Sequence, residues 1–184
     1  MKIIAEKSKC WDGSSTMQVI YNDGGRKEEG WKGNAGDCVV RAIAIATETP
    51  YQQVYDAMWE MNAKFMQTSR TKVAKRMRDK GATPRNGNFK HVYRPYLESL
   101  GWQWVPTMGI GTGCKVHLCE GELPHGRIIA RCSRHLTAII DGVIHDTYDP
   151  QWASIVNEAG KQQRIAHRCV YGYFTKRDCD AKAA

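Results

Sequence analysis

The sequence lacks the features that would place the protein in a membrane or secreted class. No apolar run among its 184 residues approaches the length of a membrane-spanning helix, and there are no internal repeats or low-complexity segments. The first residues become charged too early for a secretory signal peptide, which needs a longer apolar stretch. We therefore expect a cytoplasmic protein with no membrane partner.

Cysteines at the regular spacing of a disulfide framework are also missing. The chain has seven, an odd number, at Cys10, Cys38, Cys114, Cys119, Cys132, Cys169 and Cys179. A cytoplasmic location keeps thiols reduced, so we expect no disulfide framework. Cys114, His117 and Cys119 lie close together in the sequence, but they lack the paired CxxC spacing of a zinc site. We therefore favour buried structural thiols over a zinc site. We predict no metal and no cofactor.

The remaining composition is that of an ordinary globular domain, with 42% hydrophobic and 25% charged residues. We expect one domain over residues 1–184, with residues 1–30 as an N-terminal extension and residues 175–184 as a frayed tail. The formal net charge of +8 favours acidic partners, including nucleic acid. Part of this charge forms a basic stretch, which is either a solvated helix face or a surface for phosphates or acidic partners: Arg70, Lys72, Lys75, Arg76 and Arg78.

The segment around Cys38 is the most informative part of the chain. A glycine-containing loop leads to Asp37, which is a good helix N-cap, and an apolar run follows. This pattern makes Cys38 the first residue of a helix that ends near Thr47. The positive end of the helix dipole favours a thiolate at that position, although the neighbouring Asp37 opposes it. A partner base would decide the pKa of Cys38.

A candidate base lies about one hundred residues later, in a predicted hairpin. Asp141-Gly142 between two apolar runs indicates a two-residue turn, which pairs Ile140 with Val143 and Ala138 with His145. Because side chains alternate along a strand, His135 and Asp146 then share one face of the sheet. A histidine oriented by a carboxylate is the base that a cysteine nucleophile needs.

The other patterns predict an α+β fold, with helices first and an antiparallel sheet after them. Thr49, Pro50 and Gln52 indicate an N-cap, a first helical residue and a capping box for a second helix, whose apolar stripe includes Trp59. Further helices are expected over residues 71–80 and 90–100, with Pro95 best placed in a first turn. Strands are expected over residues 15–21, 102–105, 127–132 and 164–174.

A cysteine that begins a helix, a distant histidine that opens a strand and an aspartate on the next strand together resemble the papain-like cysteine peptidase superfamily. Residues 36–43 resemble the nucleophile helix of ovarian-tumour-type deubiquitinases and of bacteriocin-processing peptidases. The whole chain resembles small cysteine-peptidase-like proteins encoded by tailed phages, with residues 31–60 and 126–150 carrying the likeness. The resemblance implies a papain-like fold, with the nucleophile helix in an N-terminal helical half and the His/Asp pair in a C-terminal antiparallel sheet.

The resemblance also implies an oxyanion hole. Papain-like enzymes have a glutamine shortly before the cysteine, where this chain has Lys32. Asn34 is the nearest amide that could act in its place, beside the backbone N–H of Cys38.

Three functions follow from these residues. The first is a cysteine-dependent hydrolase (a peptidase, isopeptidase or amidase) with Cys38 as nucleophile, His135 as base and Asp146 as its orienting group. Its substrate would be a protein or peptide, and in the host cytoplasm a host protein if the chain is phage-encoded. The second is a non-catalytic binding protein that holds nucleic acid or an acidic host protein on its basic surface. The third is a transglutaminase-like acyltransferase with the same triad.

Overall fold

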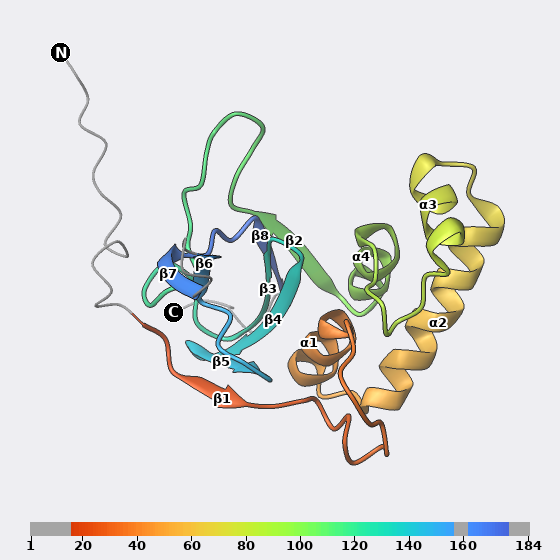
Figure 1. The fold of residues 1–184 in the computed structure, drawn as a ribbon, viewed down its shortest axis with the longest axis horizontal. Helices are drawn as coiled ribbons and strands as arrows, with labels where there is room; N and C mark the ends of the chain where they lie inside the picture. Colours follow the sequence, from red (N-terminus) through yellow and green to blue (C-terminus); the bar gives the residue numbers. More distant parts are fainter. Residues whose placement is uncertain (1–15, 157–161, 177–184) are drawn as a thin grey trace, which may run out of the picture.

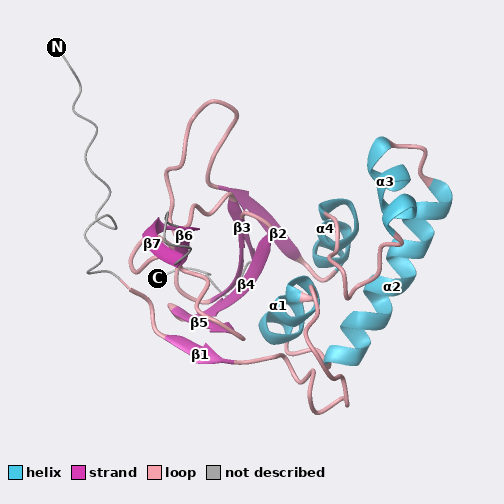
Figure 2. Ribbon diagram, viewed as in Figure 1, coloured by secondary structure: helices cyan, strands magenta, loops and turns pink. Residues whose placement is uncertain are grey.

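The protein has an α+β architecture in the computed structural model, which describes residues 16–156 and 162–176. Figure 1 shows the helices on one side of the molecule and the strands on the other, with α1 between them, and Figure 2 shows the same division by secondary structure. The helices are α1 (Cys38–Thr47), α2 (Tyr51–Thr68), α3 (Lys72–Lys80) and α4 (Lys90–Ser99). The strands are β1 (Val19–Tyr21), β2 (Trp102–Pro106), β3 (Arg127–Cys132), β4 (His135–Ile140), β5 (Val143–Asp146), β6 (Trp152–Val156), β7 (Gln162–His167) and β8 (Gly172–Lys176).

Six of the strands form one sheet, in the order β1-β5-β4-β3-β8-β2. The predicted hairpin register is confirmed, since Ile140 pairs with Val143 and Ala138 with His145. The prediction of an antiparallel sheet is wrong at one edge, where β1 runs parallel to β5. Parallel strands need a long connection, and here that connection passes through the whole helical part of the chain. The sheet is therefore mixed.

Side chains along the central strand β4 alternate between the two faces of the sheet, and those on both faces are buried. Leu136 and Ala138 belong to the larger apolar cluster, which also contains the inner faces of α1, α2 and α4. Ile139 belongs to a second cluster on the opposite face of the sheet, with Ile128 and Ile144. Helix α1 packs directly against β4. This packing brings the beginning of α1 close to the beginning of β4.

The N-terminal segment belongs to this fold where the structure describes it. Residues 16–30, part of the expected N-terminal extension, contain β1 and the buried Arg26. At the other end, Thr175 and Lys176 of the expected tail are the last residues of β8. The remaining residues of both expected segments lie outside the described ranges, as does the start of the strand predicted over residues 15–21.

Three local predictions at helix ends and faces need correction. Asp37 precedes α1, but its side chain makes no capping hydrogen bond. Helix α2 begins at Tyr51 with Pro50 at its N-cap, and the Thr49 hydroxyl accepts a hydrogen bond from Thr47. Trp59 is 52% exposed, because the buried stripe of α2 follows Tyr51, Val54, Tyr55 and Met58. Asp37 contacts arginines instead of the helix N–H groups, and Thr49 contacts its neighbour Thr47.

Two predictions about chain breaks are also wrong. Helix α4 begins at Lys90 and contains Pro95 in its interior. Pro95 and His91, whose carbonyl would have paired with the missing N–H, are both exposed, so water can replace that hydrogen bond. The single strand predicted over residues 164–174 is two strands, β7 and β8, which belong to different sheets.

The expectation that the cysteines are reduced is wrong for some of them. Cys114 and Cys169 form a disulfide with a Cα–Cα distance of 5.8 Å, and Cys119 is also disulfide-bonded. Among the described cysteines, Cys38 and Cys132 are free thiols. The spacing of the cysteines could not predict this disulfide, because the two partners are 55 residues apart in the sequence. Their segments are aligned by backbone pairing in an isolated antiparallel β-bridge between His117 and Cys169.

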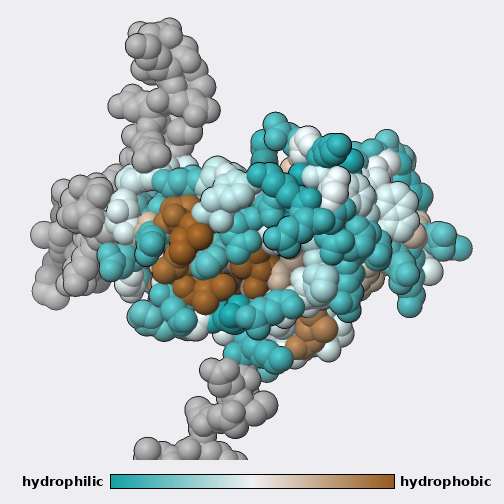
Figure 3. All heavy atoms as spheres, turned by 90° about the horizontal axis from the view of Figure 1, so that it is seen from below, coloured by the Kyte–Doolittle hydropathy of each residue, from teal (hydrophilic) through white to brown (hydrophobic). Residues whose placement is uncertain are grey.

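The surface is mixed in character. On the face seen from below, apolar side chains gather in one area bordered by hydrophilic ones (Figure 3). On the edge strand β1, Ile20 is 42% exposed. In the ranges that the structure describes, no helix combines the length and the apolar character needed to cross a membrane.

Candidate active site

Cys38 lies at the first position of α1, as the sequence predicts. Its thiol is partly buried where the start of the helix meets the start of β4. Hydrogen bonding and the positive charge of His135, with a smaller contribution from the backbone N–H of Leu136, lower the pKa of the Cys38 thiol. Both groups favour the thiolate, because a charged sulfur is the better acceptor.

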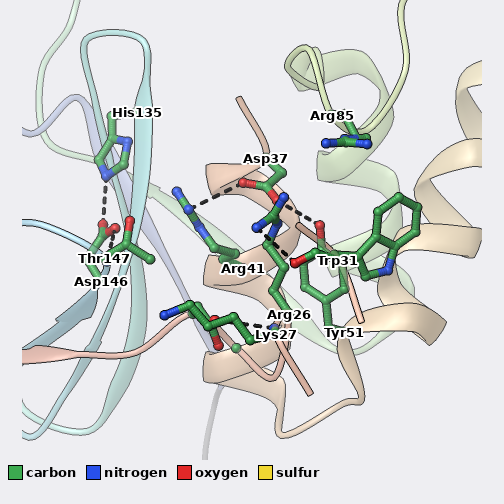
Figure 4. Close-up of polar contacts among 12 residues, drawn as sticks. Arg26, Lys27, Trp31, Asp37, Arg41, Tyr51, Arg85, His135, Asp146 and Thr147 are labelled. Atoms are coloured by element: carbon green, nitrogen blue, oxygen red, sulfur yellow. Dashed lines mark hydrogen bonds and ion pairs between the residues drawn. The ribbon is translucent and has the colours of Figure 1, made fainter. Parts of the chain in front are cut away.

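His135 and Asp146 form the contact that the hairpin predicts. The distance from His135 Nε2 to Asp146 Oδ2 is 2.7 Å, and the two side chains are 6% and 5% exposed. Because Nε2 faces Asp146, Nδ1 is the ring nitrogen left for Cys38. The second carboxylate oxygen of Asp146 accepts a hydrogen bond from the backbone N–H of Thr147 at 2.7 Å. Both oxygens are thus held, and the imidazole is oriented by a fixed carboxylate (Figure 4).

The electrostatics of the three groups favour a thiolate–imidazolium pair. Burial alone would raise the pKa of Cys38, but the hydrogen bond and charge of His135 outweigh it and lower that pKa below 9.0. Burial alone would lower the pKa of His135, but the hydrogen bonds to Asp146 and Cys38 raise it to about 9. The two opposite shifts favour a negative sulfur beside a positive imidazole. A thiolate at neutral pH is the reactive form of a nucleophilic cysteine.

Asp37 forms a buried charge cluster directly before Cys38. Its carboxylate lies 2.8 Å from Arg26 Nε and 3.3 Å from Arg41 Nη1, and it accepts a hydrogen bond from the Tyr51 hydroxyl at 2.7 Å (Figure 4). Arg26 also donates to the backbone carbonyls of Trp31 and Lys32. The cluster therefore ties the preceding loop to α1 and α2 and fixes the position of the first turn. Sequence reasoning missed it, because Arg26 lies in a polar segment with no recognisable pattern.

Tyr148 is a second site residue that the sequence did not indicate. Its ring centroid lies 5.1 Å from that of His135, and the ring is 49% exposed. The short distance from Asp146 along the chain was the available signal. Tyr148 partly covers the imidazole, while its own ring remains half exposed.

The predicted oxyanion groups are near the site, but their role remains a prediction. The backbone N–H of Cys38 lies in the first turn of α1, where N–H groups have no partner within the helix. The structure places Asn34 on the surface, lining a pocket that also includes Ala35 and Arg41. Asn34 makes no side-chain hydrogen bond with any described residue, so its amide is available to a ligand.

The remaining predicted groups lie away from this site. The basic residues Arg70, Lys72, Lys75, Arg76 and Arg78 are all exposed on or beside α3. Arg78 donates to the backbone carbonyls of Met66 and Ser69, which attaches α3 to the end of α2. Within the described residues, no three or more His, Cys, Asp or Glu side chains are arranged to hold a metal ion.

Comparisons of the chain with protein-family models, with curated proteins and with solved structures gave no match. The geometry by itself defines an α+β protein with a Cys–His–Asp arrangement in which the histidine and the aspartate are buried.

Proposed function

We propose that the protein is a cysteine-dependent acyl hydrolase that acts on peptide, isopeptide or other amide bonds. The observation that carries this proposal is the contact of His135 with Asp146 at 2.7 Å, together with the lowering of the Cys38 pKa by the same histidine. A single buried cysteine or histidine would be unremarkable in a core. Here a cysteine, a histidine and an aspartate lie together, and the pKa of Cys38 is lowered while that of His135 is raised. This combination favours a nucleophile and its base. The papain-like fold inferred from the sequence agrees with this chemistry.

In the proposed reaction, the Cys38 sulfur attacks the carbonyl carbon and the carbonyl oxygen becomes an oxyanion. The backbone N–H of Cys38 and the Asn34 amide are the proposed donors to that oxygen. The His135 imidazolium gives its proton to the leaving amine, the C–N bond breaks and a thioester remains. The neutral imidazole then takes a proton from water, which attacks the thioester, and the acid product leaves with Cys38 restored. Asp146 stabilises the imidazolium throughout.

An acyl-enzyme experiment tests this proposal without knowledge of the natural substrate. Incubation with p-nitrophenyl acetate should release p-nitrophenolate and add one acetyl group to Cys38, detected by intact-protein and peptide mass spectrometry. Cys38→Ala should abolish both signals, and Cys132→Ala, which removes the other free thiol among the described residues, should preserve them. Acetylation that persists in Cys38→Ala, or that never reaches Cys38, would contradict the proposal. A primary amine in the same assay distinguishes hydrolysis from transfer, since a transglutaminase-like enzyme would form the acetamide.

The biological setting follows from resemblance and remains part of the proposal. The likeness to phage-encoded proteins favours a protein or peptide substrate, a host protein among them. A cytoplasmic location is proposed on the same basis. The Cys114–Cys169 disulfide weighs against that location, because cytoplasmic thiols are normally kept reduced.

The basic surface supports a second candidate function, that of a binding protein. Arg70, Lys72, Lys75 and Arg76 are exposed and make no ion pair with any described residue. Such a surface fits nucleic acid or an acidic protein, and its binding should weaken steeply with salt. Binding of a DNA duplex that is unchanged in Cys38→Ala and lost when three of these charges are removed would favour this function. Absence of binding at low salt would exclude nucleic acid as the partner.

A further inference from the structure

A pocket of about 720 Å³ lies beside the candidate triad. Two of its walls come from the site itself. Arg41 lies one turn after Cys38 on α1, and its positive charge contributes to lowering the pKa of Cys38. Tyr148 contacts the His135 ring on the opposite side. A substrate bound to the Cys–His pair would therefore extend into this pocket.

The charged residues in the lining of the pocket are mainly positive. Arg26, Lys27, Lys32 and Arg41 are among its residues, and Asp23 is the one carboxylate in the described lining. The Asp23 oxygens accept hydrogen bonds from the backbone N–H groups of Gly25 and Lys27. Lys27 and Lys32 are exposed, so their ammonium groups can turn toward a ligand.

Arg41 adds a charge that the protein does not neutralise. Asp37 is shared by two guanidinium groups, so the cluster keeps one net positive charge. Arg26 is the closer partner, and its other N–H groups donate to backbone carbonyls. Arg41 makes one longer contact with Asp37, at 3.3 Å, and its side chain remains 14% exposed in the pocket wall. Its remaining donors are available to an anion, for which a guanidinium is well suited.

Aromatic rings complete the pocket. Tyr21 and Tyr148 are about half exposed. Trp31 is held by a hydrogen bond from its Nε1 to Gln52 and by a tilted ring contact with Tyr55. Apolar ring faces beside fixed positive charges are suited to a peptide whose acidic group points at the charges.

We propose that this pocket is a substrate subsite that binds a carboxylate next to the scissile acyl bond. The carboxylate comes from an acidic side chain or from a chain terminus, and the assignment rests on the proposed acyl-hydrolase function. Lys27 and Lys32 attract the anion, and Arg41 binds it. The substrates are then acidic peptides or proteins, which agrees with the net charge of +8.

Two alkylating reagents of nearly equal size test the proposal directly. Iodoacetate carries a carboxylate and iodoacetamide does not, and the rates of Cys38 alkylation by each are measured by peptide mass spectrometry. The imidazolium of His135 also attracts iodoacetate, so the informative quantity is the change in the rate ratio between variants. Lys27→Gln combined with Lys32→Gln should lower the iodoacetate-to-iodoacetamide ratio by at least about threefold at low salt and leave the iodoacetamide rate unchanged. Arg41→Gln should lower the ratio further.

The matched control is Lys64→Gln, which removes an exposed lysine from α2 and should leave the ratio unchanged. Three hexapeptides, each tested for protection of Cys38 from iodoacetamide, then distinguish the source of the carboxylate. They are a neutral amidated peptide, its form with one internal glutamate, and its form with a free C-terminus. An unchanged ratio in the double lysine variant, or protection by the acidic peptides no better than by the neutral one, would overturn the proposal. Failure of the proposed function gives a different result: slow alkylation of Cys38 by both reagents that does not depend on His135.

Discussion

At the scale of single residues, two buried carboxylates have different tasks around the candidate nucleophile. Asp146 accepts hydrogen bonds from one imidazole and one backbone N–H. Asp37 lies between two guanidinium groups and a phenol. The first could be predicted, because a two-residue turn fixes which side chains share a face of the hairpin. The second could not, since Arg26 reaches Asp37 through a loop whose path depends on tertiary contacts.

The first prediction concerns the charge of Asp146. Asp146→Asn keeps the size of the side chain but removes the negative charge that favours the imidazolium. The pKa of His135, about 9 in the native protein, should fall by about one to two pH units. The measurement is an NMR titration of the imidazole nitrogens. Asp141→Asn, at the exposed hairpin turn, is the control and should leave the pKa of His135 unchanged; the same pKa in Asp146→Asn would show that this carboxylate does not act on the histidine.

The second prediction concerns Asp37. Asp37→Asn leaves the buried Arg26 without a charged partner, and the free energy of unfolding should fall by about 3–5 kcal/mol. Glu48→Gln removes one partner of the exposed ion pair with Arg127 and should change the free energy of unfolding by about 1 kcal/mol or less. Urea unfolding of the two variants gives the comparison. Equal effects would mean that the Asp37 cluster does not hold the loop.

At the scale of elements, the four helices were located correctly, but the residues that begin them were only partly predicted. Apolar periodicity places a helix within a few residues, because it depends on which face is buried. Caps depend on one side-chain torsion, and neighbours can capture the side chain. The Asp37 carboxylate contacts arginines and the Thr49 hydroxyl contacts Thr47, whereas the Thr71 hydroxyl contacts Ser69 and still caps α3.

The third prediction uses this contrast. The Thr71 hydroxyl accepts a hydrogen bond from the backbone N–H of Ala74 at 3.2 Å, so Thr71→Ala should lower the free energy of unfolding by about 0.5–2 kcal/mol. Thr49→Ala removes a hydroxyl that has no capping role and should cost less. Chemical denaturation measures both. A larger loss for Thr49→Ala would contradict the assignment of the two N-caps.

At the scale of the whole molecule, the sequence indicated the α+β class but not which distant strands pair in the sheet. The local β3–β4–β5 order follows from short turns. The pairing of β1 with β5, and the insertion of β8 between β3 and β2, join segments far apart in the chain. Short-range patterns carry no information about such pairings. The same reason explains why the disulfide was missed.

The fourth prediction concerns that disulfide. The Cys114–Cys169 bond closes a loop of 55 residues, so it restricts the unfolded chain. Replacing both cysteines by serine should lower the free energy of unfolding by about 2–4 kcal/mol under non-reducing conditions. Peptide mapping without reductant should first show the bond in the native protein. Free thiols at both positions in that map would contradict the pairing.

The central claim is that His135 activates Cys38, and the pH dependence of Cys38 alkylation by iodoacetamide tests it most directly. In the native protein the rate should rise at a lower pH than for an ordinary thiol, because the pKa of Cys38 is lowered. In His135→Ala the two largest influences that lower the pKa are lost, and burial, which raises it, is opposed only by Leu136 and Arg41, so the rate at pH 7 should fall at least about tenfold. Cys132, whose pKa burial raises to about 11, is the internal control and should stay unreactive at neutral pH. An identical Cys38 profile in the native protein and in His135→Ala would contradict the account.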